Sequence, residues 1–171
     1  MPLRSNSSSL ALGAVAVLLG MLSACAPPPG PTPSPTPAFA TEEEAFAAAE
    51  KVYREYVEAA NRGGKDSAFL AGKALESEIE TNRYLKANDL VLEGSLLIND
   101  VHGVSATFDT PVAEVLLEIC VDVSQSRVLN SAGADVTPPS RAGTWLLLVT
   151  FVGTRDHLLV SDSSPVEDRS C

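Results

Sequence analysis

Histidine and cysteine are scarce in this sequence of 171 residues, which has only two histidines and three cysteines. Three cysteines are too few for a disulfide scaffold or a zinc knuckle. Basic residues are also few: 12 Lys and Arg stand against 22 Asp and Glu, a formal net charge of −10. A surface this acidic repels phosphate backbones, so nucleic-acid binding is excluded as a main role. The same charge disfavours electrostatic docking onto anionic lipid.

An apolar content of 45% is ample for a hydrophobic core and argues against a disordered chain. We expect residues 1–24 to be an export signal and residues 25–40 to be a tether. The remaining residues, 41–171, are enough for one folded domain and too few for two.

The first 25 residues have the pattern of a bacterial lipoprotein signal. Arg4 gives a short basic region, and Leu10 to Leu22 is an uncharged run too short to span a bilayer. The quartet Leu22-Ser23-Ala24-Cys25 resembles the lipobox, in which the cysteine receives diacylglycerol and the signal is then cleaved. This resemblance implies lipidation of Cys25 by fatty-acyl chains and attachment to the extracytoplasmic face of the cell membrane. The alternative is an ordinary signal peptide with an incidental cysteine at its end.

The stretch 26–40 contains seven prolines in fifteen residues, a composition that favours extended polyproline II and prevents a packed core. At about 3.1 Å per residue it would hold a domain roughly 45 Å from the membrane. The alternative is a proline-rich ligand for a partner domain.

Helices are predicted first along the remaining chain. Thr41 with Glu44 forms a capping-box pattern, and Gly63-Gly64 is a helix stop, so one helix should lie between them. Two further helical stretches are expected, at about 66–72 and 75–85. The apolar face of the first helix comprises Phe46, Ala49, Tyr53, Tyr56 or Val57, and Ala60.

After Asn88 the apolar residues alternate with polar ones, the period of strands. Turns are expected at Asn99-Asp100, at Asn130 to Gly133 with a return through Val136, and at Pro138-Pro139. Helices followed by a meander of strands indicate an α+β fold, with the helices packed on an antiparallel sheet. The expected strands are 90–98, either as a strand pair or as one long strand bent at Gly94, 104–108 with Val104 and Ala106 on one face, 115–123, 127–129, a central strand 144–152, and 157–160.

Several segments resemble a known family when taken together: Ile119 to Ser124, the turn Ala132 to Val136, the strand with Trp145, and the terminal Cys171. In this order, after N-terminal helices, they resemble exported actinobacterial lipoproteins with a nuclear-transport-factor-2-like, or cystatin-like, cone. The resemblance implies helices packed on a curved antiparallel sheet. The wider superfamily contains isomerases, cyclases, dehydratases and non-catalytic binding modules, whereas the lipoprotein group implies no specific function.

The search for catalytic chemistry gives little. His102 and His157 follow Asp100 and Asp156, yet no second histidine or cysteine has ligand spacing, so we expect no metal and no cofactor. Cys120 is a candidate nucleophile, yet it lies between Glu118 and Asp122, whose negative charge would raise the pKa of the thiol and suppress the thiolate.

The superfamily enzymes place a tyrosine of the first helix and buried carboxyls around a central pocket, in the manner of ketosteroid isomerase. Tyr53 and Tyr56 would be the tyrosines here, and Asp100, Asp109 and Asp122 the carboxyls. Two hypotheses therefore stand. The favoured one is a non-catalytic lipoprotein module that binds an envelope protein or a small apolar ligand. The alternative is a small isomerase-like or cyclase-like enzyme acting on a hydrophobic carbonyl compound.

A disulfide between Cys120 and Cys171 is the last prediction. With Cys25 consumed by lipid, two cysteines remain in an exported protein, where oxidation persists. Strand alternation directs Cys120 to the polar face with Glu118 and Asp122, and a bond there would hold the acidic C-terminal tail, from Asp162 onward, across that face.

Overall fold

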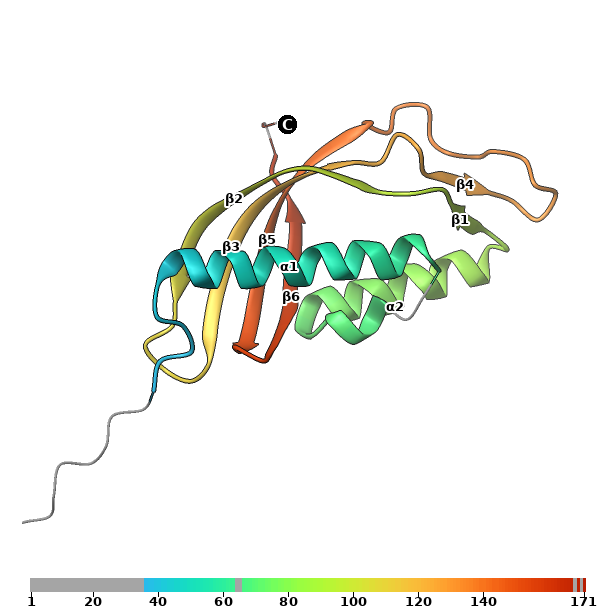
Figure 1. The fold of residues 1–171 in the computed structure, drawn as a ribbon. Coiled ribbons are helices and arrows are strands. Elements are labelled where there is room, and N and C mark those ends of the chain that lie inside the picture. Colours follow the sequence, from blue (N-terminus) through green and yellow to red (C-terminus); the bar gives the residue numbers. More distant parts are fainter. Residues whose placement is uncertain (1–35, 64–65, 168, 170) are drawn as a thin grey trace, which may run out of the picture. The chain divides into compact units, whose positions relative to one another are not determined.

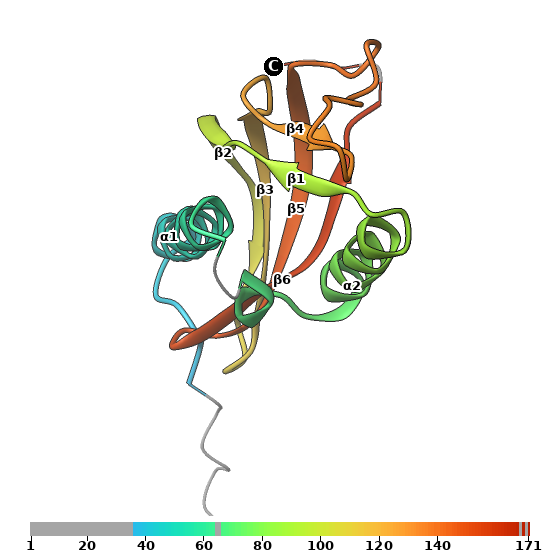
Figure 2. The same ribbon diagram turned by 90° about the vertical axis from the view of Figure 1, so that its right-hand side faces the viewer.

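The structure, a computed structural model, describes residues 36–63, 66–167, 169 and 171 (Figures 1 and 2). The predicted signal peptide, Cys25 and residues 26–35 of the predicted tether lie outside the described residues. The helices are α1 (Glu42–Asn61), the 3₁₀ helix η1 (Asp66–Phe69) and α2 (Gly72–Ala87). The strands are β1 (Val91–Glu93), β2 (Leu97–Thr107), β3 (Ala113–Asp122), β4 (Arg127–Leu129), β5 (Thr144–Thr154) and β6 (His157–Pro165).

The first helix begins at the predicted cap. The Glu44 backbone N–H donates to Thr41 Oγ1 at 3.2 Å, and the Glu44 carboxylate accepts from the Ala40 N–H at 2.9 Å. Three acids in the first turn favour the positive end of the helix. The helix ends before Gly63, whose φ of +63° suits glycine, so both predicted boundaries are confirmed.

A four-stranded antiparallel sheet in the order β2-β3-β5-β6 forms the body, and β1 pairs with β4 in a separate two-stranded sheet. The predicted α+β class is therefore confirmed, as is the central position of β5. The break between β1 and β2 falls at Gly94, where the bend was expected.

The core lies between α1 and one face of the sheet, which we call the inner face. Alternate β3 residues on this face are almost completely buried, as the period of two predicts. Tyr53 of α1 packs edge-on against Phe151 of β5, with ring centroids 6.4 Å apart. Residues Ala45, Ala49, Tyr53 and Val57 give α1 its buried stripe, and Val115, Leu117, Ile119, Val121, Val149 and Phe151 face it.

Two β-bulges in β2 correct the predicted turn at Asn99-Asp100. The strand continues through these residues and pairs with β3, and the ladder shifts between Ile98 and Asp100 and again between Gly103 and Ser105. The first bulge absorbs the extra residue without ending the ladder. The second one leaves Val104 exposed, so its predicted position beside Ala106 is wrong.

The folded domain also begins earlier than the predicted boundary at Thr41. Ala38 and Phe39 are buried in the core, and the Ala38 N–H donates to the carbonyls of Phe108 and Thr110. The Arg155 guanidinium lies 5.6 Å from the centre of the Phe39 ring and also pairs with Glu44. The last three residues of the predicted tether, 38–40, therefore belong to the fold, because the phenylalanine has an apolar site to fill.

Tertiary contacts also move two other boundaries. The expected helical stretch at 66–72 is a short 3₁₀ helix, and α2 begins at Gly72 because Leu70 and Ala71 pair with Val160 of β6. Strand β6 continues past the predicted end at Val160 as far as Pro165, so the start of the acidic tail belongs to the sheet.

Candidate functional site

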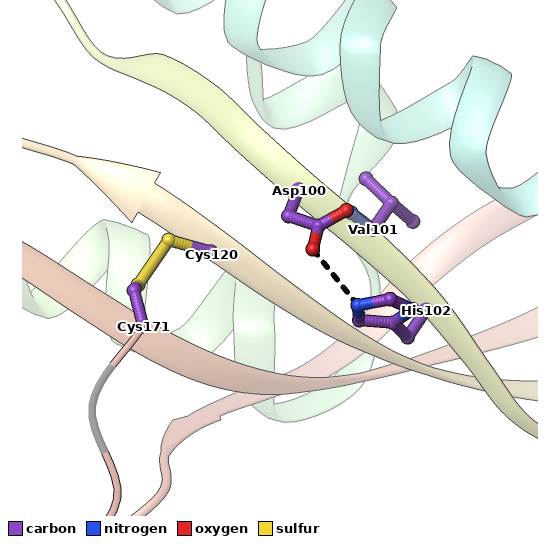
Figure 3. The surroundings of a disulfide bond; sticks show 5 residues. All are labelled: Asp100, Val101, His102, Cys120 and Cys171. Carbon is purple, nitrogen blue, oxygen red and sulfur yellow. Dashed lines mark hydrogen bonds and ion pairs between the residues drawn. A yellow bond between two sulfur atoms is a disulfide. The ribbon is translucent and has the colours of Figure 1, made fainter.

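The outer face of the sheet carries the disulfide. Cys120 and Cys171 are joined, with Cα atoms 5.5 Å apart, in agreement with the predicted pair (Figure 3). Cys120 lies near the end of β3 and is buried. Because the Cys120 thiol forms this disulfide, it is not free to act as the nucleophile that the sequence suggested.

Charged side chains next to the disulfide hold the tail as well. Arg169 donates to both carboxylate oxygens of Glu118, at 2.6 and 2.9 Å. These hydrogen bonds lower the pKa of Glu118. His102, directly across the ladder from Glu118, has its Nε2 2.8 Å from Asp100 Oδ2 (Figure 3). The sequence analysis missed Arg169, because nothing local to the tail identifies its partner on β3.

The residues of the enzyme hypothesis are not brought together. Tyr53 and Tyr56 lie on the core side of α1, where burial raises the pKa of both phenols. For Tyr56 the pKa rises to about 12, with Glu78 and Asp66 adding to the effect of burial.

The three carboxyls of that hypothesis lie elsewhere. Asp100 is exposed on β2 beside His102, and Asp109 belongs to the turn after β2. The Ser124 side chain and the Ser124 N–H both donate hydrogen bonds to the Asp122 carboxylate at the end of β3, and these bonds lower the pKa of Asp122. Asp100 and Asp122 are thus engaged with His102 and Ser124, and neither is paired with Tyr53 or Tyr56 as the enzyme hypothesis requires.

The histidine pairs offer no metal centre in the part of the chain that the structure covers. His102 contacts a single carboxylate and His157 begins β6, and no group of three or more His, Cys, Asp or Glu gathers among the described residues.

Two open grooves run along the flanks of α1. The larger, of about 620 Å³, lies between α1 and the start of β2, where Leu96 to Ile98 form its apolar wall. Its acids Glu50, Glu55 and Glu58 are paired with Arg54, Lys51 and Arg62, each one turn away along the chain. This groove therefore has a nearly neutral lining and no convergent ionisable groups.

A third surface feature is the small sheet, which we call the flap: β1, β4 and residues 134–136, which pair with β4. Leu92 pairs with Val128, and the bridge between Leu129 and Asp135 places Val128 opposite Val136. The Val136 N–H donates to the Val128 carbonyl at 2.8 Å. One face of the flap thus carries an aliphatic row, Leu92–Val128–Val136.

Arg141 fixes the base of the flap. Its guanidinium donates to the carbonyls of Val123 and Ser126 and to the Ser126 hydroxyl. The sequence analysis predicted the turn and the return through Val136 but missed Arg141, since an isolated arginine gives no signal of which carbonyls it will bind.

Comparison with known proteins gives little more. No family model and no curated protein matches this sequence. A crystal structure of the intermembrane space region of the chloroplast protein ARC6 is similar, with 12% identity over 74% of this chain and 96% of that chain and a TM-score of 0.45. This likeness transfers no function. No helix among the described residues is long and apolar enough to cross a membrane.

Proposed function

We propose that this protein is a membrane-anchored extracytoplasmic lipoprotein whose α+β domain is a non-catalytic binding module. The lipobox-like quartet ending in Cys25 supports the anchor. The observation that carries the proposal is the entry of the chain into the fold. Phe39 ties the chain to the end of the domain where β2 finishes, so the opposite end, with the flap, is free to meet a partner.

We further infer that the sheet and helices form the nuclear-transport-factor-2-like cone. Bulges in β2 and β6 support it, because each one bends its strand and increases the local twist. Trp145 supports a binding role for the inner face. It lies across from buried Val121 yet is 41% exposed, and its neighbour along that face, Leu147, is only partly buried. An apolar ligand at this end of the inner face would contact Trp145.

Metabolic labelling with an alkyne fatty acid tests the anchor. The full chain produced in a bacterial host with lipoprotein processing should be labelled and should sediment with membranes. Cys25→Ser should abolish the label and leave the chain unprocessed by the lipoprotein route, because the acceptor thiol is lost. The matched control is Cys120→Ser, which should keep the label because that thiol lies in the folded domain. Labelling that persists in Cys25→Ser would refute the anchor.

A further inference from the structure

The aliphatic row of the flap is exposed although its side chains are large. Leu92 is 52% exposed and Val136 is 44% exposed, and Val128 between them is half-buried. Each strand of the flap has three residues, and β1 and β4 contribute nothing to the buried core. A two-stranded sheet of this size is marginal in water by itself. Something other than hydrophobic burial must therefore hold it in place.

Polar side chains fix the flap through hydrogen bonds to its own backbone. Asn130 Oδ1 accepts from the N–H groups of Ala132 and Ala134, each at 3.0 Å. Thr137 Oγ1 accepts from the Val128 N–H at 2.8 Å, and Asp135 accepts from the Thr137 N–H at 2.9 Å. These bonds hold the aliphatic row in one conformation before any partner arrives. A surface fixed in advance loses less conformational entropy on binding.

The flap lies at the end of the domain opposite the chain entry (Figure 1). Ala38 bonds to Phe108 and Thr110 just beyond the last residue of β2, whereas β1 comes just before its first residue. The eleven residues of β2 therefore separate the two sites, by roughly 35 Å at about 3.3 Å per residue. In an anchored protein, the flap would lie at the end of the domain opposite the entry of the tether.

Charge distinguishes between the possible binding partners of the flap. The acids Asp89, Glu93 and Asp135 outnumber the cations beside the flap, which are Arg127, between the last two acids, and Arg141 at the base of the flap. A second copy would bring the same acidic border and another net charge of −10, and an anionic lipid surface would also be repelled. A protein with an apolar patch bordered by Lys and Arg would be attracted instead.

We propose that the flap is the docking surface for a second envelope protein, which presents an apolar patch with a basic rim to the row Leu92–Val128–Val136. This inference rests on the proposed binding role and names the surface and the kind of partner.

Site-specific photo-crosslinking in cells that make the full chain tests this inference. A benzophenone amino acid is placed at Leu92 or, as the matched control, at Val112, which is equally exposed at 52% but lies in the turn at the chain-entry end. We expect one protein to be crosslinked from position 92 and not from position 112. Its crosslinked peptide, sequenced by mass spectrometry, should contain aliphatic residues flanked by Lys or Arg.

The purified partner then binds the mature full chain in detergent, and the affinity is measured at two salt concentrations. Leu92→Asp and Val136→Asp should each weaken binding about tenfold or more, whereas Val112→Asp should not change it. Raising the salt from 50 to 500 mM should slow association. Unchanged circular dichroism spectra of the variants exclude unfolding as the cause.

Four outcomes overturn the inference: no product from position 92, equal products from both positions, a crosslink to a second copy of this chain, or a crosslink to lipid. Fatty-acid labelling of the same cells separates this failure from failure of the anchor. A labelled chain without a flap-specific partner contradicts the docking surface alone, and an unlabelled chain contradicts the anchor.

Discussion

Replacing Phe39 by alanine measures how much of the predicted tether the domain needs. The ring is only 3% exposed and belongs to the same core cluster as Tyr53 and Phe151. Truncating a buried phenylalanine to alanine costs about 3–5 kcal/mol, because apolar contacts are lost and a cavity remains. The loss of the contact with the half-exposed Arg155 guanidinium adds about 0.5 kcal/mol.

A chain that starts at Thr41 should lose slightly more than the Phe39→Ala variant. It lacks the ring and also the Ala38 N–H, whose hydrogen bonds to Phe108 and Thr110 contribute about 1 kcal/mol. The expected loss of about 4.5–6.5 kcal/mol is a large share of the 5–15 kcal/mol typical of a domain. A chain that starts at Thr36 should keep full stability.

Urea unfolding gives the free energies. Trp145 is the single tryptophan, so its fluorescence follows the transition without interference, and far-UV circular dichroism confirms it. With a slope of about 2 kcal/mol per molar urea, the midpoint of Phe39→Ala should fall by about 2 M.

Two control variants accompany Phe39→Ala. Phe39→Leu should lose clearly less, because it keeps an apolar side chain, and Thr36→Ala should lose nothing, because Thr36 is exposed. Equal midpoints for the chains starting at 36 and 41 would refute the earlier boundary.

Four further substitutions test other parts of the fold. Cys120→Ser should lower the free energy of unfolding by about 4 kcal/mol, since the disulfide closes a loop whose ends are 51 residues apart, and reduction of the wild type should give the same midpoint in urea; no difference between oxidised and reduced protein would contradict the bond. Gly94→Ala should destabilise by about 2–5 kcal/mol in the same assay, because its φ is +99° and the new Cβ would lie 1.9 Å from a backbone carbonyl oxygen. Gly133→Ala, at φ +76° in open space, should cost only about 1 kcal/mol, and equal losses for the two glycines would refute the steric argument. The pKa of Tyr56 is raised to about 12 and that of Tyr53 is raised as well, so the unfolded chain loses both protons first, and stability should fall as the pH rises from about 10 to 12; Tyr56→Phe should reduce the slope of that part of the pH profile of unfolding, with the remainder due to Tyr53, and an unchanged slope would contradict it.

Local sequence determined the elements whose signals lie within a few residues. The cap at Thr41 and the stop at Gly63 bound α1, because a capping side chain and a left-handed glycine act on their own turn. Strict alternation predicted the buried face of β3 and, by elimination, the outward direction of Cys120. Cysteine counting then paired Cys120 with Cys171, because only one pairing of two remaining cysteines exists.

Tertiary structure decided the features that depend on a partner far along the chain. By sequence alone, Phe39 resembles the end of a proline-rich linker. Only the folded core provides a buried site for its ring. By sequence alone, Asn99 is typical of a turn. Pairing of β2 with β3 places it in a β-bulge within the strand instead. Arg141 and Arg169 acquire roles only when folding brings carbonyls or a carboxylate to them. Short-range patterns encode dihedral preferences and facing directions, whereas such contacts form between residues whose separation in the sequence carries no local signal.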